Sequence, residues 1–180
     1  MLFWIFIILA ATAFVVYYFN KIIVLENRIN NAWAQIDVQL KKRADLVPNL
    51  VETVKGYAKH EKSVFENVTK ARATMLSAKT INQKVKAGNQ LADALKTIFA
   101  VAENYPKLRA SENFLQLQEE LSGIEDKIAY ARQFYNDSIL AFNNTVKTIP
   151  GVWFANLMGK KEKPMLKIKE VERKPVKVKF

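Results

Sequence analysis

The stretch SENFLQLQEELSGIEDKIAYARQFYNDSILAFNNTVKTIPG, residues 111–151, decides the fold of this chain. Its apolar or small side chains recur every three or four residues, at Phe114, Leu117, Leu121, Ile124, Ile128, Ala131, Tyr135, Ile139, Phe142, Val146 and Ile149. That spacing is typical of an amphipathic helix that packs along neighbouring helices, as in a coiled coil. Ser111 is a typical N-cap residue and Pro150-Gly151 a typical stop, so we expect one long helix between them.

The same spacing continues on the N-terminal side of this stretch. A first body helix carries it at Leu25, Ile29, Trp33, Ile36 and Leu40. Pro48 then removes a backbone hydrogen bond and disfavours helical geometry at Val47. We therefore expect a kink or a break in this helix near Asp45–Val47.

Two more helices are expected between Pro48 and residue 111. An apolar stripe runs from Leu50 to about Ser77, and Thr80 with Gln83 forms a capping box that opens the next helix. Tyr105-Pro106 closes that helix. Only five glycines and five prolines occur in the chain, which favours helix throughout.

A continuous apolar stretch, LFWIFIILAATAFVVYYF at residues 2–19, precedes the body, and no charged side chain appears before Lys21. As a helix it would be about 27 Å long, close to the roughly 30 Å of a bilayer core. Tyr17, Tyr18 and Phe19 are typical of an interfacial aromatic belt. We expect a retained anchor from Leu2 to Phe19; a cleaved signal peptide, cut near Ala11-Thr12-Ala13, is the alternative.

These patterns predict an all-α protein in which an N-terminal transmembrane helix continues into an elongated antiparallel bundle of about four long helices. The expected parts are an anchor at residues 1–20, a helical bundle at 21–159, and a basic tail at 160–180 that is disordered alone. Lys21, Arg28 and Lys41 to Arg43 follow the anchor and nothing basic precedes it. The charge bias predicts a short N-terminus outside and a cytoplasmic body.

The residue types needed for most catalytic or metal sites are scarce. The chain has no cysteine, its one histidine is His60, and no glycine-rich phosphate loop occurs. His60 beside Glu61 could act as a lone acid–base pair, although exposed pairs of this kind are usually plain surface. We expect no enzymatic activity, no catalytic residue, no cofactor and no metal site.

Several polar side chains fall beside the apolar seams of the expected helices. They are Arg43, Asp45, Asn49, Arg72, Glu125, Arg132, Tyr135, Asn136 and Asn143. Such groups either join helices to one another or form a partner surface near Pro48. The residues we expect to fix the bundle geometry and any partner surface are Trp33, Asp45, Pro48, Asn49, Arg72, Arg132, Tyr135 and Asn136.

The tail is strongly basic. Residues 160–180 contain nine Lys or Arg and three Glu, while the whole chain has a net charge of +11. Lipid contact through Lys160, Lys161 and Lys163 is one reading, because anionic headgroups attract such segments. A solvated tail, or a strand added to a partner's sheet, are the others. The chain has no nucleic-acid-binding motif, so no nucleic acid is expected.

The stretch from Trp33 to Glu61, WAQIDVQLKKRADLVPNLVETVKGYAKHE, closely resembles the signature of the LemA family. The later pattern, with Tyr105-Pro106, Phe114, Ala131-Arg132, Tyr135-Asn136 and Pro150, resembles it too. Val152-Trp153-Phe154 and the basic Lys160–Lys163 depart from the family's usual sequence. The resemblance implies a bacterial-type protein with one N-terminal span, a short extracellular N-terminus and a long helical bundle. Its members are not known as enzymes, and some are associated with magnetosomes.

Taken together, these features predict a non-enzymatic, membrane-anchored scaffold or interaction protein at the cytoplasmic face. Its partners would be the bilayer and either a second copy of the chain or another membrane protein. The alternative is a module that binds anionic lipid through its basic tail.

Overall fold

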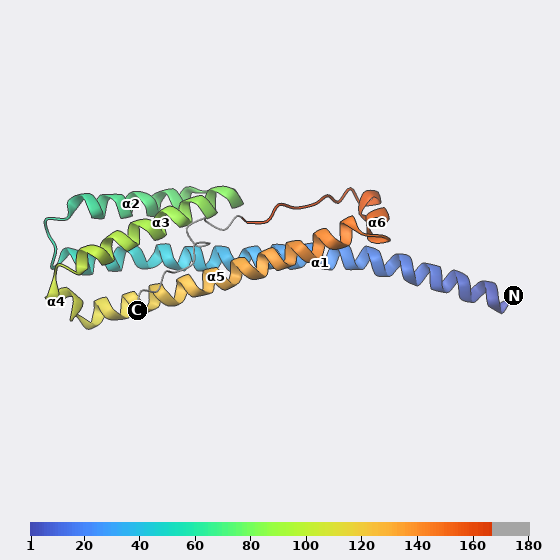
Figure 1. The fold of residues 1–180 in the computed structure, drawn as a ribbon, viewed down its shortest axis with the longest axis horizontal. Helices are drawn as coiled ribbons and strands as arrows, with labels where there is room; N and C mark the ends of the chain where they lie inside the picture. Colours follow the sequence, from blue (N-terminus) through green and yellow to red (C-terminus); the bar gives the residue numbers. More distant parts are fainter. Residues whose placement is uncertain (167–180) are drawn as a thin grey trace, which may run out of the picture. The chain divides into compact units, whose positions relative to one another are not determined.

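The computed structural model describes residues 1–166, and every regular element in that part of the chain is a helix (Figure 1). Long helices alternate with short ones. They are α1 (Leu2–Lys55), α2 (Lys62–Ser77), α3 (Ile81–Ala102), α4 (Pro106–Arg109), α5 (Glu112–Lys147) and α6 (Gly151–Leu157). The all-α prediction is thus confirmed.

The helices form two compact units. Unit 1 consists of Met1–Trp33 and Ala131–Phe180, and unit 2 is the continuous stretch Ala34–Tyr130 between them. Helices α1 and α5 each contribute one part to unit 1 and another to unit 2.

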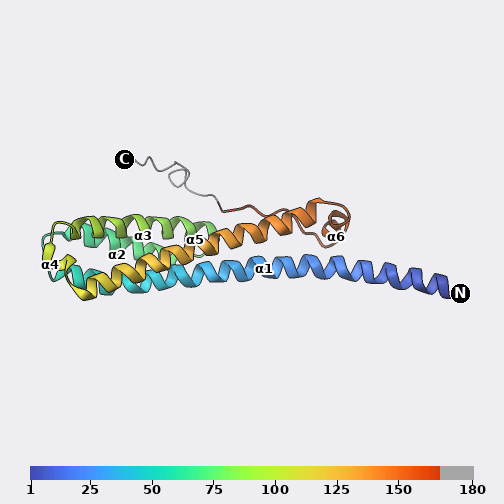
Figure 2. The same cartoon turned by 60° about the horizontal axis from the view of Figure 1, so that its bottom comes forward.

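Unit 2 is a bundle of four helical segments, made by the second part of α1, α2, α3 and the first part of α5. Helices α2 and α3 lie side by side and run in opposite directions (Figures 1 and 2). The predicted capping box opens α3: the Thr80 hydroxyl accepts from the Gln83 N–H, and the Gln83 side chain accepts from the Thr80 N–H. The largest apolar side chains of this core that are fully buried are Ile36, Leu40, Leu50, Leu91, Ile98, Leu108 and Ile128.

Helix α1 passes through Pro48 without a break and ends at Lys55. The chain is interrupted instead between Gly56 and Glu61, where glycine has low helix propensity. A break near Asp45–Val47 is therefore wrong, while the other expected outcome, a kink there, stays a prediction. Val47, Leu50, Val51 and Val54 are buried on both sides of the proline, so packing in unit 2 maintains the helix there.

Unit 1 contains the N-terminal part of α1. Among the described residues, α1 is the helix that is long and apolar enough to span a membrane. No residue in its most apolar stretch of 18 residues is buried. Beside its C-terminal end lies the second part of α5, whose seam residues Tyr135, Ile139, Phe142 and Val146 are buried as the spacing predicted. Two residues of the predicted seam are not buried: Leu117 in α5 is half-buried, and Ile149, which lies beyond the end of α5, is exposed.

Helix α6 folds back onto the end of α5. Gly151 permits this, because a side chain there would collide with the carbonyl oxygen of Thr145. Gly151 and Ala155, one turn apart, are both buried on the inner face of α6.

Candidate functional site

The eight residues predicted to fix the bundle and its partner surface are divided between the two units. Unit 2 holds Asp45, Pro48, Asn49 and Arg72, and unit 1 holds Trp33, Arg132, Tyr135 and Asn136. Within each unit the residues differ in burial and in contacts, so each is described from its own surroundings.

Asp45, Pro48 and Asn49 are exposed on α1, as is Glu52. Positions three or four apart share one face of a helix, so these four residues form a polar strip on the surface of unit 2. We call Asp45, Pro48, Asn49 and Glu52 the α1 strip. The side chains of the α1 strip take no part in the core of unit 2.

Arg72 has a different role. Its Nε donates a hydrogen bond of 2.8 Å to the carbonyl oxygen of Ala44, which lies four residues before Pro48. In an uninterrupted helix this oxygen accepts from the N–H of residue 48, which proline lacks. Arg72 therefore replaces the missing donor from the neighbouring helix.

Arg43 is the largest fully buried side chain of unit 2, with 1% of its surface exposed. Its Nη1 donates to both carboxylate oxygens of Glu125, at 2.6 and 2.8 Å, and its Nη2 donates to the carbonyl oxygen of Gly88. One guanidinium thus joins α1, α3 and α5. Gly88 makes room for it: a Cβ at this position would lie 3.2 Å from Arg43 Nη2 and 2.8 Å from Leu40 Cδ2.

A second ion pair in unit 2 joins α1 to α3, with Lys84 Nζ 2.5 Å from Asp37 Oδ1. A hollow of about 200 Å³ lies beside the Arg43–Glu125 pair. Its other lining residues are both apolar, such as Leu95, Phe99 and Leu121, and polar, such as Lys96, Gln118 and Ser122. No group of three or more His, Cys, Asp or Glu in residues 1–166 is placed to hold a metal ion.

In unit 1, α1 and α5 meet through aromatic side chains. The rings of Trp33 and Tyr135 touch edge to face with their centroids 6.0 Å apart, and the guanidinium of Arg28 lies 4.9 Å from the Phe134 ring. Burial raises the pKa of the Tyr135 hydroxyl above its usual value. Trp33 and Tyr135 therefore serve packing between these helices, and Arg132 is half-buried near them in sequence.

After α6 the chain returns along unit 1 as an extended segment, residues 160–166, which we call the return segment. The amide side chain of Asn143 pairs with the backbone of Lys163, donating to its carbonyl and accepting from its N–H. Asn136 pairs with the backbone of Leu166 in the same way. Each asparagine amide thus makes the same pair of hydrogen bonds that the backbone of a neighbouring strand would make. These bonds hold the return segment on α5.

Glu26 of α1 binds the return segment from the other side. Its carboxylate lies 2.5 Å from Lys160 Nζ and 3.1 Å from Lys163 Nζ. The hydrogen bond from Lys160 is the main cause that lowers the pKa of Glu26, with Lys163 adding to it and partial burial opposing both. Two of the three lysines expected to touch lipid are thus engaged within unit 1, while Lys161 is exposed.

These contacts differ from the expectation of a tail that is disordered from residue 160. The prediction of disorder rested on the small number of apolar side chains in the tail. It did not include the asparagines of α5, whose side-chain amides pair with the extended backbone. The remainder of the tail, residues 167–180, lies outside the described residues. The sequence does contain one signal for the contact with Glu26. Glu26 is the first acidic residue and has no acidic neighbour before Asp37, and the tail is rich in the lysines that can pair with it.

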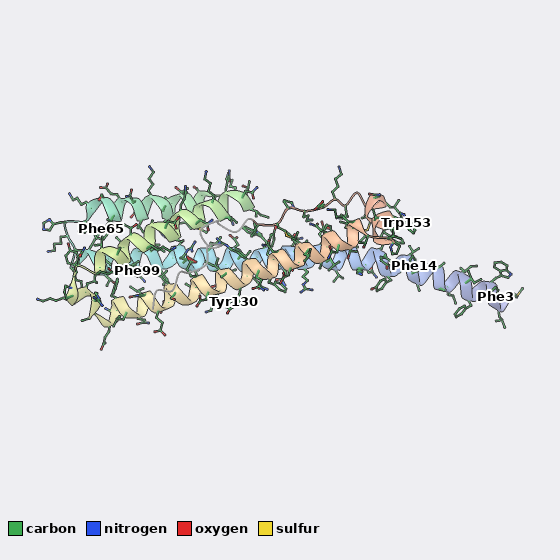
Figure 3. All side chains as sticks on the ribbon, viewed as in Figure 1. Phe3, Phe14, Phe65, Phe99, Tyr130 and Trp153 are labelled. Carbon is green, nitrogen blue, oxygen red and sulfur yellow. The ribbon has the colours of Figure 1, made fainter. Side chains whose placement is uncertain are left out.

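The predicted anchor residues differ in their surroundings. Leu2 is exposed, whereas Phe19, at the other end of the anchor, is half-buried and its ring lies 5.8 Å from that of Phe154 in α6. Phe14 also contacts Phe154, with centroids 5.9 Å apart. The C-terminal end of the anchor and α6 therefore share one aromatic cluster, near the labelled Phe14 and Trp153 in Figure 3.

Comparison with known proteins gives a consistent match. The model described as "LemA family" matches residues 32–180. The chain is similar to "Protein LemA" of Metamycoplasma hominis, 28% identical over 133 residues that cover 72% of this chain and 59% of the relative. It is also similar to "Magnetosome protein MamQ" of Magnetospirillum gryphiswaldense, 22% identical over 152 residues, with coverage of 70% and 56%. The chain thus spans less than two thirds of the length of these relatives.

Proposed function

Because the chain belongs to the LemA family, we propose that it is a non-enzymatic, membrane-anchored helical scaffold that presents a surface of its bundle to a protein partner. The partner is either a second copy of this chain or another membrane protein.

The observation that carries the proposal is the nature of α1. Its N-terminal part is apolar and has no buried residue in its most apolar window, whereas its C-terminal part supplies buried residues to the core of unit 2. No Gly, Pro or Ser linker separates the two parts. One helix therefore serves both as membrane anchor and as a structural member of the bundle.

The distribution of polar groups supports an interaction role. Arg43, Glu125 and Arg72 bond within unit 2, and Glu26 and Asn143 bond within unit 1. These groups hold the fold together, which supports a structural role for them. The α1 strip, by contrast, exposes two carboxylates and an amide beside a proline, and it is our candidate partner surface.

The distribution of charge supports one side of the membrane. Lys21, Arg28 and the run Lys41–Arg43 follow the anchor, and basic residues favour the cytoplasmic side. We therefore propose a cytoplasmic body.

Site-specific photo-crosslinking in native membranes tests the partner surface. A photoreactive side chain at Asn49 lies in the α1 strip, and one at Asn67, an exposed asparagine of α2, is the matched control. We expect a discrete adduct from position 49 that position 67 does not give, identified by mass spectrometry as this chain or as another membrane protein. Identical adduct patterns from both positions, or none from either, would refute the α1 strip as the partner surface.

The alternative, lipid recognition through the basic tail, is tested separately. In that case a Lys160→Glu, Lys161→Glu, Lys163→Glu variant would lose salt-sensitive retention on anionic over neutral vesicles after its anchor is cleaved. The exposure of Lys161 favours this reading, whereas the pairing of Lys160 and Lys163 with Glu26 reduces the charge that is free to act.

A further inference from the structure

A run without any charged residue, Ile149–Gly159, separates Lys147 from Lys160. It contains α6 and only one strongly polar side chain, Asn156. A surface helix in water normally has a polar face opposite its buried face. The composition of this run therefore differs from that of an ordinary surface helix.

The inner face of α6 packs against the anchor. The Phe154 ring stacks on that of Tyr18, with centroids 5.3 Å apart and planes 6° from parallel, and it also contacts Phe14 and Phe19. Gly151 and Ala155 are buried on the same side.

The outer face of α6 is apolar as well, and it is exposed. Trp153 is 61% exposed and Leu157 76% exposed, and Ile149 just before the helix is 72% exposed. Trp153 and Leu157 are four residues apart, so they lie on one side of the helix. Contiguous exposed apolar side chains of this size mark a contact with a partner or a membrane.

The depth of α6 along the anchor identifies the contact. Phe14 and Tyr18 are one helical turn apart, about 6 Å along the axis. They lie in the last part of the apolar stretch, just before Asn20 and Lys21. Residues in this position occupy the boundary between acyl chains and headgroups, where tyrosine and tryptophan are enriched. Because Phe154 touches both rings, α6 lies at the same boundary.

The charges around α6 agree with this location. Lys161 follows the uncharged run and is exposed, and Lys21 Nζ lies 5.8 Å from the centre of the Tyr17 ring. The other two lysines that border the run are paired with carboxylates, Lys147 with Glu162 and Lys160 with Glu26. Lysines that border an apolar segment place their ammonium groups among headgroups and favour anionic lipid.

We propose that α6 is a second membrane contact, an interfacial helix whose outer face, Ile149, Trp153 and Leu157, is inserted into the boundary between headgroups and acyl chains. The anchor spans the bilayer, and α6 rests in its surface beside the point where the anchor emerges. Unit 1 thus contacts the membrane at two places, the anchor and α6, whereas a single-span anchor would contact it at one.

The absence of native cysteine allows a direct test with the full-length chain in nanodiscs of mixed anionic and neutral lipid. An environment-sensitive fluorophore is attached at Leu157→Cys, and the matched control is Tyr130→Cys, another exposed apolar side chain, on α5 in unit 2. Both positions are exposed, so neither change disturbs a core. Helicity by circular dichroism confirms folding of each labelled protein.

We expect the label at position 157 to be quenched by lipids that carry a nitroxide near the headgroup, and to be several-fold less quenched by aqueous iodide than the label at position 130. Equal quenching by iodide at the two positions would overturn the proposal. Protection from iodide without quenching by the lipid nitroxide would overturn it too, since a second copy of the chain would then cover α6. The label gives these answers whether or not the α1 strip binds a partner.

Discussion

The Nε of Arg72 and the carbonyl oxygen of Ala44 are joined by a hydrogen bond of 2.8 Å, between residues 28 positions apart in the sequence. Ala44 lies one turn before Pro48, and its carbonyl has lost its helical donor to the proline. A side chain of α2 thus satisfies a backbone group of α1, which explains how the helix tolerates an internal proline.

Arg72→Met should therefore lower the free energy of unfolding by about 1–3 kcal/mol, because the carbonyl of Ala44, a fully buried residue, is left without a partner. Pro48→Ala returns an N–H to position 48, so Arg72→Met should cost less in that background. Urea unfolding in mild detergent of the single and double variants measures the coupling. Equal costs in the two backgrounds would show that Arg72 does not act through this carbonyl.

Glu125→Gln tests the buried guanidinium of Arg43. The carboxylate is 45% exposed while the Arg43 side chain is 2% exposed. We expect the free energy of unfolding to fall by about 2 kcal/mol. This value lies between the contribution of an exposed ion pair and the cost of breaking a fully buried one. Asp37→Asn breaks the more exposed pair with Lys84 and should cost less than about 1 kcal/mol. If urea unfolding gave similar losses for both, burial of Arg43 would not govern the energetics.

Gly151→Ala should detach α6 from α5, because the new Cβ meets the Thr145 carbonyl oxygen, a backbone atom that cannot move aside. Gly123→Ala is the control: a Cβ there has no neighbour within 4 Å, and alanine should stabilise α5 by up to about 1 kcal/mol. The readout is maleimide labelling of Ala155→Cys, a position that is 1% exposed. We expect faster labelling in the Gly151→Ala background only.

The contact between Glu26 and the return segment should depend on pH. Lys160, above all, lowers the pKa of Glu26 in the folded protein. The stabilisation is therefore fully present above the ordinary glutamate pKa of about 4.3 and is lost as the pH falls through the lower folded pKa. Hydrogen-exchange protection of the Lys163 and Leu166 amides should decline in that acid range.

Glu26→Gln provides the control for this titration. The amide cannot ionise, so protection of the same two backbone amides should be weaker at neutral pH and should lack the acid-dependent step. A decline of the same size in the variant would assign the titration to another group.

The long elements were predictable from local pattern, and the contacts between them were not. The seam of α5 follows from apolar spacing, and the start of α3 follows from the Thr80–Gln83 capping box, since each signal lies within a few residues. The passage of α1 through Pro48 depends on Arg72, which no local pattern connects to it. The sequence likewise did not show which of the predicted site residues are exposed in the α1 strip and which make contacts inside a unit. The burial of each side chain in the structure decides this.

The return segment shows the same limit. Its attachment requires Asn136 and Asn143 to be seven residues apart on α5, two helical turns, so that both amides face one extended stretch. Scattered asparagines carry no recognisable signal in a sequence. Glu26 completes the attachment from another helix, more than 130 positions away.

The order of the two units along the chain has a consequence during synthesis. Unit 2 is one uninterrupted stretch that ends at Tyr130, whereas unit 1 needs residues from both before and after it. A ribosome makes a chain from its N-terminal side, so residues 2–19 are made before unit 2, and unit 2 is complete before Phe154 exists. The rings of Phe14, Tyr18 and Phe19 therefore have no contact with Phe154 until after unit 2 has been made. Unit 1, although its first residues precede unit 2, is completed after it.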